Sequence, residues 1–314
     1  MTGERDAPGV GSANGVTVLV RGAGDLATGV AYRLYRAGFA VYLTELPEPR
    51  AVRRTVSFSE CVFRGETVVE GVRAVRVGSA AEARELLGGS GRTAGGGGGA
   101  SGGVVPVIVD TEGRALEEIQ PAVLVDARMA KRQNLGTTRA DAPVVIGVGP
   151  GFTAGEDVDA VVETARGHTL GRVIYRGEAL PPTGKPGDVG GYTTERVLRT
   201  PAAGTFRTFA KIGDCVEAGQ VVAEVVAGKE GGGGGPWPLV AQIGGVLRGL
   251  LRDGAPVRQG QKAGDVDHRF DPAALYQISD KALAVGGGVL EAVFCLLWGR
   301  PPREAVWPRA GGRR

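Results

Sequence analysis

The sequence has 314 residues, of which 42% are hydrophobic and 23% are charged, and this composition is typical of a globular protein long enough for two domains. A formal net charge of +3 gives no electrostatic argument for nucleic-acid binding, and no basic run is interleaved with aromatic residues. No apolar stretch is long enough for a membrane span and residues 1–15 do not resemble a secretion signal, so we expect a flexible tail there and a cytoplasmic protein. Three scattered cysteines predict neither a disulfide framework nor a thiolate metal site.

The first part of the chain predicts an α/β domain. An apolar run at 16–20 leads into a turn with the spacing G-x-G-x-x-A, and apolar residues at helical spacing follow it. The small residues of this turn are Gly22, Gly24 and Ala27. A second strand at 39–43 precedes Glu45, whose carboxylate lies where a dinucleotide fold binds a ribose. The pattern predicts a Rossmann-like domain over 16–190.

A glycine turn at the start of a helix favours a phosphate ligand, because the helix N-terminus offers unpaired N–H groups and a partial positive charge. Asp25 complicates this prediction, since its carboxylate would repel a pyrophosphate unless it points away or meets a metal ion. The alternative is a turn that serves only close packing of helix on sheet.

Basic and polar side chains follow the later strands. Arg53 and Arg54 are expected near the carboxyl end of the second strand, where open α/β sheets bind ligands, or else on a solvated helix face. The loop after the strand at 122–125 contains Lys131, Asn134 and Thr137, and we expect it to carry function rather than to be an ordinary surface loop. The glycine-rich stretch 88–103 is expected to be a disordered insert.

A second strand, glycine loop and helix are predicted at 143–165. An apolar strand at 143–148 runs into a glycine-rich loop, and the apolar pattern at 158–165 favours an amphipathic helix. The loop residues of interest are Gly149, Gly151, Thr153 and Gly155. Backbone N–H groups in such a loop can form an anion-binding concavity.

The second half of the chain repeats itself. Residues 201–225 align without gaps to residues 242–266, and each copy contains the phrase Gly-x-x-Val-x-x-Gly-Gln. This resembles the half-motif of biotinyl and lipoyl domains and implies a mainly-β barrel-sandwich at 196–268. Lys229 lies near the place of the carrier lysine, but its glycine-rich setting at 228–235 differs, so no biotin or lipoate is expected.

The last segment, 269–314, predicts a helix followed by a tail. Ser279 is suited to cap the helix, and the glycines at 286–288 allow a bend or close packing against another helix. We expect this helix to dock back on the first domain.

Several phrases together resemble one known family. They are GAGDLATGVAYRLYRAGF, RRTVSFSE, the Asn-Leu-Gly-Thr-Thr of 134–138, GPGFTAGEDV, RGHTLGRVIY, GGYTTERVLR, GVLRGLLRDG and ISDKALAVGGGVLEAV. The chain is thereby similar to the YqeB-type accessory proteins of the selenium-dependent molybdenum hydroxylase system. The resemblance implies a maturation role, with a molybdenum hydroxylase or other maturation factors as partners and neither nucleic acid nor membrane.

Combining the resemblance with the residues predicts that the first domain binds a phosphorylated cofactor, either the pyranopterin molybdenum cofactor or a nucleotide such as NAD. The residues expected to bind it are Gly22, Gly24, Asp25, Ala27, Glu45, Arg53, Arg54, Lys131, Asn134, Thr137, Gly149, Gly151, Thr153 and Gly155. The alternatives are an NAD-dependent oxidoreductase and a non-catalytic scaffold. No catalytic residue and no metal ligand is assigned.

Overall fold

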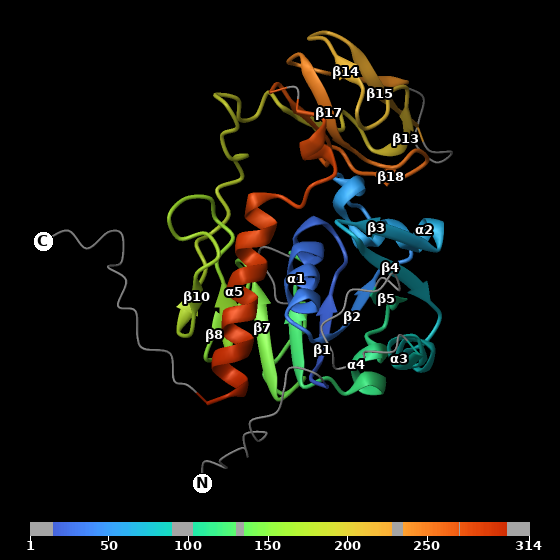
Figure 1. Cartoon of the computed structure of the whole chain (residues 1–314). Helices are drawn as coiled ribbons and strands as arrows, with labels where there is room; N and C mark the ends of the chain where they lie inside the picture. The colour runs from blue at the N-terminus through green and yellow to red at the C-terminus, as the bar shows by residue number, and fades with distance from the viewer. Residues whose placement is uncertain (1–14, 90–102, 130–134, 228–234, 270, 300–314) are drawn as a thin grey trace, which may run out of the picture.

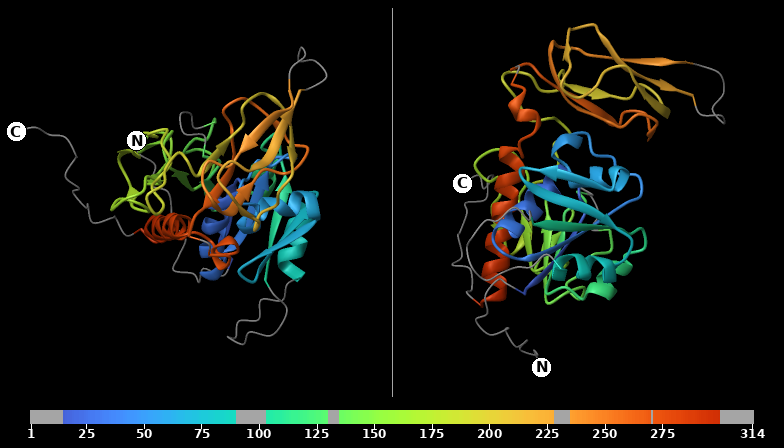
Figure 2. Two further views of the ribbon diagram at one scale, coloured as in Figure 1. Left: turned by 90° about the horizontal axis from the view of Figure 1, so that it is seen from above. Right: turned by 45° about the vertical axis from the view of Figure 1, so that its right-hand side comes forward.

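The computed structural model describes residues 15–89, 103–129, 135–227, 235–269 and 271–299 and arranges them in two units. The first unit is built on a nine-stranded sheet and the second on two four-stranded sheets. Figures 1 and 2 show the second unit stacked on the first, with helix α5 (Asp280–Leu297) running from the junction along one face of the large sheet. Lys131, Asn134, Lys229 and most of both glycine-rich stretches lie outside the described residues.

The large sheet has the strand order β10-β9-β7-β6-β1-β2-β5-β4-β3. Its members are β1 (Thr17–Arg21), β2 (Ala40–Glu45), β3 (Glu66–Val69), β4 (Val72–Val77), β5 (Val104–Val109), β6 (Val123–Asp126), β7 (Val144–Val148), β9 (Ala160–Val162) and β10 (Val173–Ile174). The inner strands are parallel, and the edge strands β3 and β10 pair antiparallel to their neighbours. The carboxyl ends of β6, β1, β2 and β5 therefore lie side by side at one edge of the sheet.

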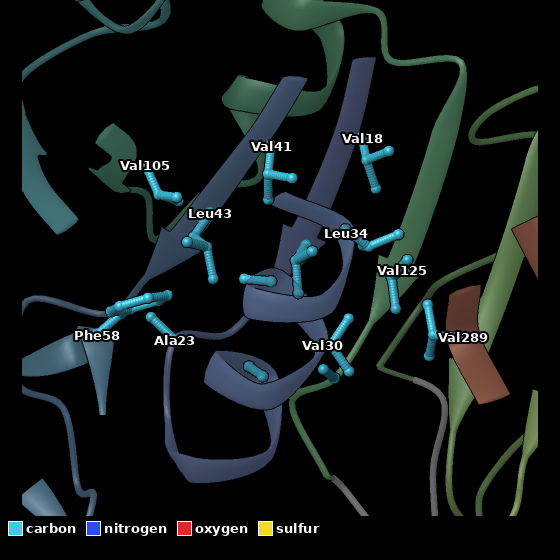
Figure 3. Packing of buried hydrophobic residues seen from close by; sticks show 14 of the residues in the cluster. Val18, Ala23, Val30, Leu34, Val41, Leu43, Phe58, Val105, Val125 and Val289 are labelled. Atoms are coloured by element: carbon cyan, nitrogen blue, oxygen red, sulfur yellow. The ribbon is translucent and has the colours of Figure 1, made fainter. Parts of the chain in front are cut away.

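Each face of this sheet has its own hydrophobic core, because successive side chains of a strand point to opposite faces. Val18 and Val20 of β1 face α1 (Asp25–Arg36) and α5, whereas Leu19 faces the side of α3 (Ala80–Gly89) and α4 (Arg114–Ile119). Figure 3 shows Val30 and Leu34 of α1 among buried residues of β1, β2 and β6.

The predicted Rossmann-like class is wrong for this unit, because the regular alternation of strands and helices is missing. No helix lies between β7 and β9, and none lies in the described residues between β6 and β7. The helix predicted at 158–165 is instead β9 with flanking loop. Val158, Val161 and Val162 are all fully buried, and periodicity alone cannot separate a short buried strand from a buried helix. The path from β2 to β5 also passes through the short helix α2 (Cys61–Arg64) and an antiparallel hairpin.

Other local predictions are confirmed. A strand, a glycine turn and helix α1 follow one another from Thr17 to Arg36. Helix α5 is capped by Ser279, whose hydroxyl accepts a hydrogen bond of 3.1 Å from the backbone N–H of Ala282. These elements were predictable because their signals are local.

The second unit contains two four-stranded antiparallel sheets, in the orders β12-β19-β17-β14 and β16-β15-β13-β18. The strands are β12 (Val197–Arg199), β13 (Gly204–Thr208), β14 (Cys215–Val216), β15 (Val221–Val226), β16 (Trp237–Val240), β17 (Gly245–Leu250), β18 (Pro256–Val257) and β19 (Lys262–Asp267). Strands β13, β14 and β15 recur as β17, β18 and β19 at the repeat spacing. The predicted biotinyl/lipoyl-like barrel-sandwich class is wrong, because the strands are divided between two sheets that no strand pairing closes into a barrel within the described residues.

Asp267, at the end of β19, predicts a pH dependence of stability. Arg269 donates to both of its carboxylate oxygens, at 2.9 and 2.6 Å, and these bonds lower the Asp267 pKa from 3.8 to about 2. A carboxyl group with a lowered folded-state pKa contributes stability that is lost as the pH falls from the unfolded value through the folded one. We expect Asp267→Asn to reduce the free energy of unfolding by about 2 kcal/mol at pH 7. Urea unfolding should show this deficit shrinking below pH ~4, and a deficit that stays constant down to pH ~3 would contradict the prediction.

Candidate ligand-binding cleft

A cleft of about 770 Å³ opens at the carboxyl edge of the large sheet. This volume lies within the usual range for small-molecule sites. The walls come from the ends of β1, β2, β5 and β6 and from the residues that follow them, including segments 44–46, 48–51, 110–113, 127–129 and 135–136. Ligands of open α/β sheets bind at this edge, so the cleft is the candidate functional site.

The glycine turn forms one wall of the cleft. The backbone requires glycine at position 22 but not at position 24. Gly22 has a φ of +99°, and a Cβ there would lie 3.3 Å from the carbonyl oxygen of Ala127, so both backbone conformation and close approach favour glycine. Gly24 has an ordinary φ of −71°, and a Cβ there would meet no atom within 4 Å. Gly24 therefore leaves open space in the cleft that a larger side chain could fill.

Glu45 holds this turn in place. Its carboxylate accepts hydrogen bonds from the backbone N–H groups of Ala23, at 2.9 Å, and Leu46, at 2.8 Å. Burial raises the pKa of Glu45, and the two hydrogen bonds act in the opposite direction. Both oxygens accept backbone bonds, so Glu45 has a structural role in addition to its place in the lining of the cleft, where a ribose contact was expected.

Guanidinium groups occupy the side of the cleft formed by β1 and β6. Arg21, the last residue of β1, donates to Thr137 at 2.6 Å and pairs with Asp141 at 3.3 Å. Arg128 donates through Nε and Nη2 to the two oxygens of the buried Asp126 carboxylate. It also donates to the Thr137 hydroxyl at 3.0 Å. Both arginines are therefore held in position before a ligand arrives.

Carboxylates occupy the other side, formed by β2 and β5. Glu45 ends β2, and Asp110 directly follows β5, where it accepts the N–H groups at the start of α4. Glu48 and Glu112 are exposed members of the same wall. The order of the strands thus places Arg21 and Arg128 at one side of the cleft and most of the carboxylates at the other, where Arg50 also follows β2.

The residues predicted to bind a cofactor do not all meet at this cleft. Those that line it are Gly22, Gly24, Asp25, Ala27 and Glu45. Thr137 is buried and holds Arg21 and Arg128. Arg53 and Arg54 face the second unit instead, as Arg53 donates to the carbonyl groups of Ala274 and Gln277 and Arg54 to that of Leu250.

The second glycine loop lies away from the cleft and is folded on itself. Thr153 donates its backbone N–H to Asp157 at 2.8 Å and its hydroxyl to Glu178 at 3.1 Å. None of Gly149, Gly151, Thr153 and Gly155 lines the cleft. With β9 in place of the predicted helix, the loop is not followed by a helix N-terminus that could bind an anion.

Sequence reasoning missed several residues of the cleft. They are Arg21, Leu46, Glu48, Asp110, Arg128 and Leu135. Most of them end or follow an apolar strand within a few residues, which is the signal that could have found them. Leu46 and Leu135 are about half exposed, at 52% and 50%, and give the cleft an apolar surface.

Comparison with known proteins gives one curated relative. It is "Uncharacterized protein YqeB" of Escherichia coli (strain K12), 48% identical over 280 residues. The chain is similar to YqeB over this length. The predicted resemblance to YqeB is confirmed, and the match covers 89% of this chain but 48% of YqeB, so the chain spans about half the length of that relative. No protein-family model matches the chain.

Solved structures with some similarity include an ectoine utilization protein and a succinylglutamate desuccinylase/aspartoacylase. The ectoine utilization protein EutE (DoeB) of Ruegeria pomeroyi is 13% identical, with a TM-score of 0.24 and coverage of 81% of this chain and 86% of that one. A succinylglutamate desuccinylase/aspartoacylase of Rhodobacter sphaeroides is 17% identical, with a TM-score of 0.24 and coverage of 81% and 85%. TM-scores this low support no argument about the activity of this chain.

The predicted role in molybdenum hydroxylase maturation is wrong. The description of YqeB names no activity, and the lining of the cleft disagrees with such a role through a phosphorylated cofactor, because carboxylates outnumber guanidiniums there. The carboxylates are those of Asp25, Glu45, Glu48, Asp110 and Glu112, and the guanidiniums are those of Arg21, Arg50 and Arg128. Such a lining disfavours a pyrophosphate, which argues against the NAD-dependent oxidoreductase, and a ligand-sized cleft argues against a bare scaffold. Binding of the molybdenum cofactor or of NAD itself stays a prediction.

Two searches of the described residues have negative results. No helix there has both the length and the apolarity needed to cross a bilayer. No three His, Cys, Asp or Glu side chains there are grouped as ligands for a metal ion.

Proposed function

We propose that the cleft binds a small zwitterionic organic molecule. The observation that carries this proposal is the order of charges along the sheet edge, with Arg128 and Arg21 following β6 and β1 and Glu45 and Asp110 following β2 and β5. A carboxylate of the ligand would lie against the guanidiniums, and an ammonium group would lie against the carboxylates.

The spacing of the strands limits the size of this ligand. Neighbouring strands lie roughly 4.8 Å apart, so the adjacent ends of β1 and β2 suit the charges of an amino acid, and the full edge from β6 to β5, roughly 14 Å, admits a dipeptide-sized molecule. The half-exposed side chains of Leu46 and Leu135 offer an apolar surface for its uncharged body. The proposal is therefore an amino-acid-like or dipeptide-like ligand with an apolar part.

The test uses leucylglycine and two analogues that each lack one charge, N-acetyl-leucylglycine and leucylglycinamide. Isothermal titration calorimetry is expected to show the zwitterion binding at least about tenfold more tightly than either analogue, a difference of about 1.4 kcal/mol. Gly24→Trp, which fills the open space, is expected to abolish binding, whereas Gly24→Ala is expected to retain it. Equal affinities for all three probes, or undiminished binding to the Trp variant, would contradict the proposal.

A further inference from the structure

Three arginines meet at one buried carboxylate, at the seam between the two units and apart from the cleft. Glu60 ends the 3-10 turn η2 (Phe58–Glu60), and its side chain is only 5% exposed. One of its oxygens, Oε1, contacts Arg54 at 3.2 Å, Arg64 at 3.3 Å and Arg252 at 3.1 Å. Arg252 belongs to the second unit and the other two to the first.

This group carries more positive charge than its carboxylate neutralises. Three guanidiniums share one carboxylate, and a single oxygen has two lone pairs for three donors. Glu66 is paired with Arg73 at 3.2 Å, and Asp253 accepts from the N–H of Thr208 at 2.8 Å. Among the four ion-paired groups themselves, three guanidiniums and one carboxylate, the excess is two positive charges.

The two outer arginines are both fixed and accessible. Arg252 stacks over the ring of Phe63, at 4.2 Å from the ring centroid, and its side chain is 40% exposed. Arg64 contacts Glu60 through Nε, and its side chain is 63% exposed. The planar forks of two neighbouring guanidiniums match the oxygens of a tetrahedral oxyanion.

We propose that Arg64 and Arg252, anchored by Glu60, form a binding site for a dianionic oxyanion, such as phosphate, sulfate or a phosphate monoester. Two negative charges would balance the excess of the cluster. Because one arginine comes from each unit, the bound anion would also link the second unit to the first, and it would stabilise the folded chain by mass action.

The test is thermal unfolding of the full chain in sodium phosphate or sodium sulfate, against sodium chloride at the same ionic strength. We expect both dianions to raise the Tm by about 2–4 °C in a saturable way. The Tm of each variant in phosphate or sulfate is compared with the Tm of the same variant in chloride. Arg64→Gln and Arg252→Gln should each lose this increase, and Arg73→Gln, which alters an exposed ion pair with Glu66, should keep it.

Two further arms separate the alternatives. Gly24→Trp should keep the increase, because its substitution fills the cleft and leaves the seam intact; loss of the increase in this variant would overturn the proposal by placing the anion in the cleft. Glycerol 2-phosphate, a phosphate monoester without the ammonium and carboxylate groups proposed to bind in the cleft, distinguishes a monoester from the free ion by which of the two gives the larger increase in Tm. Equal Tm values in phosphate, sulfate and chloride, or an increase that survives in both arginine variants, would also overturn it.

Discussion

Gly286→Ala is expected to lower the free energy of unfolding by about 3 kcal/mol, even though alanine is the better helix former. Helix α5 crosses α1 at this position, and a Cβ on Gly286 would lie 2.5 Å from the backbone carbonyl oxygen of Gly29 and 2.9 Å from Cγ of Arg33. Gly29 faces the same constraint, because its Cβ would lie 2.6 Å from the carbonyl oxygen of Ala282. Two backbones in contact cannot yield as a flexible side chain can. Urea unfolding of the variant measures the effect.

The neighbouring glycine supplies the matched control. A Cβ on Gly287 would meet no atom within 4 Å, so Gly287→Ala adds the same methyl group to the same helix without a clash. This variant is expected to be more stable than the natural chain, by up to about 1 kcal/mol, through helix propensity alone. Equal effects of the two substitutions would show that the crossing of α1 and α5 is less tight than the structure indicates.

These glycines show what the sequence could and could not predict about the fold. The run at 286–288 indicated close packing, and the turn at 22–27 indicated a strand followed by a helix, because both signals are contained in a few residues. Which glycine of the run meets α1 depends on the partner helix, about 250 residues earlier in the chain. The buried apolar run at 158–165 was misread for a related reason, since only its pairing with β7 shows it to be a strand.

The candidate site likewise contains residues that could be predicted from the sequence and residues that could not. The residues of the glycine turn and Glu45 were placed correctly at the sheet edge, since β1 and β2 are neighbours in sequence and in space. The partner of a long side chain was not predictable, because Arg53 and Arg54 bind carbonyl groups contributed by the second unit and by the segment that returns from it. Arg21 was overlooked because its partners, Thr137 and Asp141, are more than 110 residues distant.

Arg53→Met is expected to lower the free energy of unfolding by about 3 kcal/mol. The guanidinium is buried, with 7% of the side chain exposed, and it donates to the carbonyl groups of Ala274, at 3.2 Å, and Gln277, at 3.1 Å. It also pairs with Asp25 at 3.4 Å. Methionine fills a similar volume but leaves these acceptors without a donor. Urea unfolding measures the loss of stability, and hydrogen exchange should show faster exchange over 273–278, the segment that Arg53 connects to the first unit.

Arg50→Met separates this structural role from ligand binding. Arg50 is exposed and lines the cleft, so its substitution should leave the free energy of unfolding unchanged within about 0.5 kcal/mol while weakening the binding of leucylglycine. The opposite pattern, with an Arg53 variant of normal stability that no longer binds the ligand, would return Arg53 to the binding site that the sequence predicted. The Arg50 and Arg53 variants together therefore test two separate roles. Arg50 is expected to contact the ligand, and Arg53 is expected to join the two units.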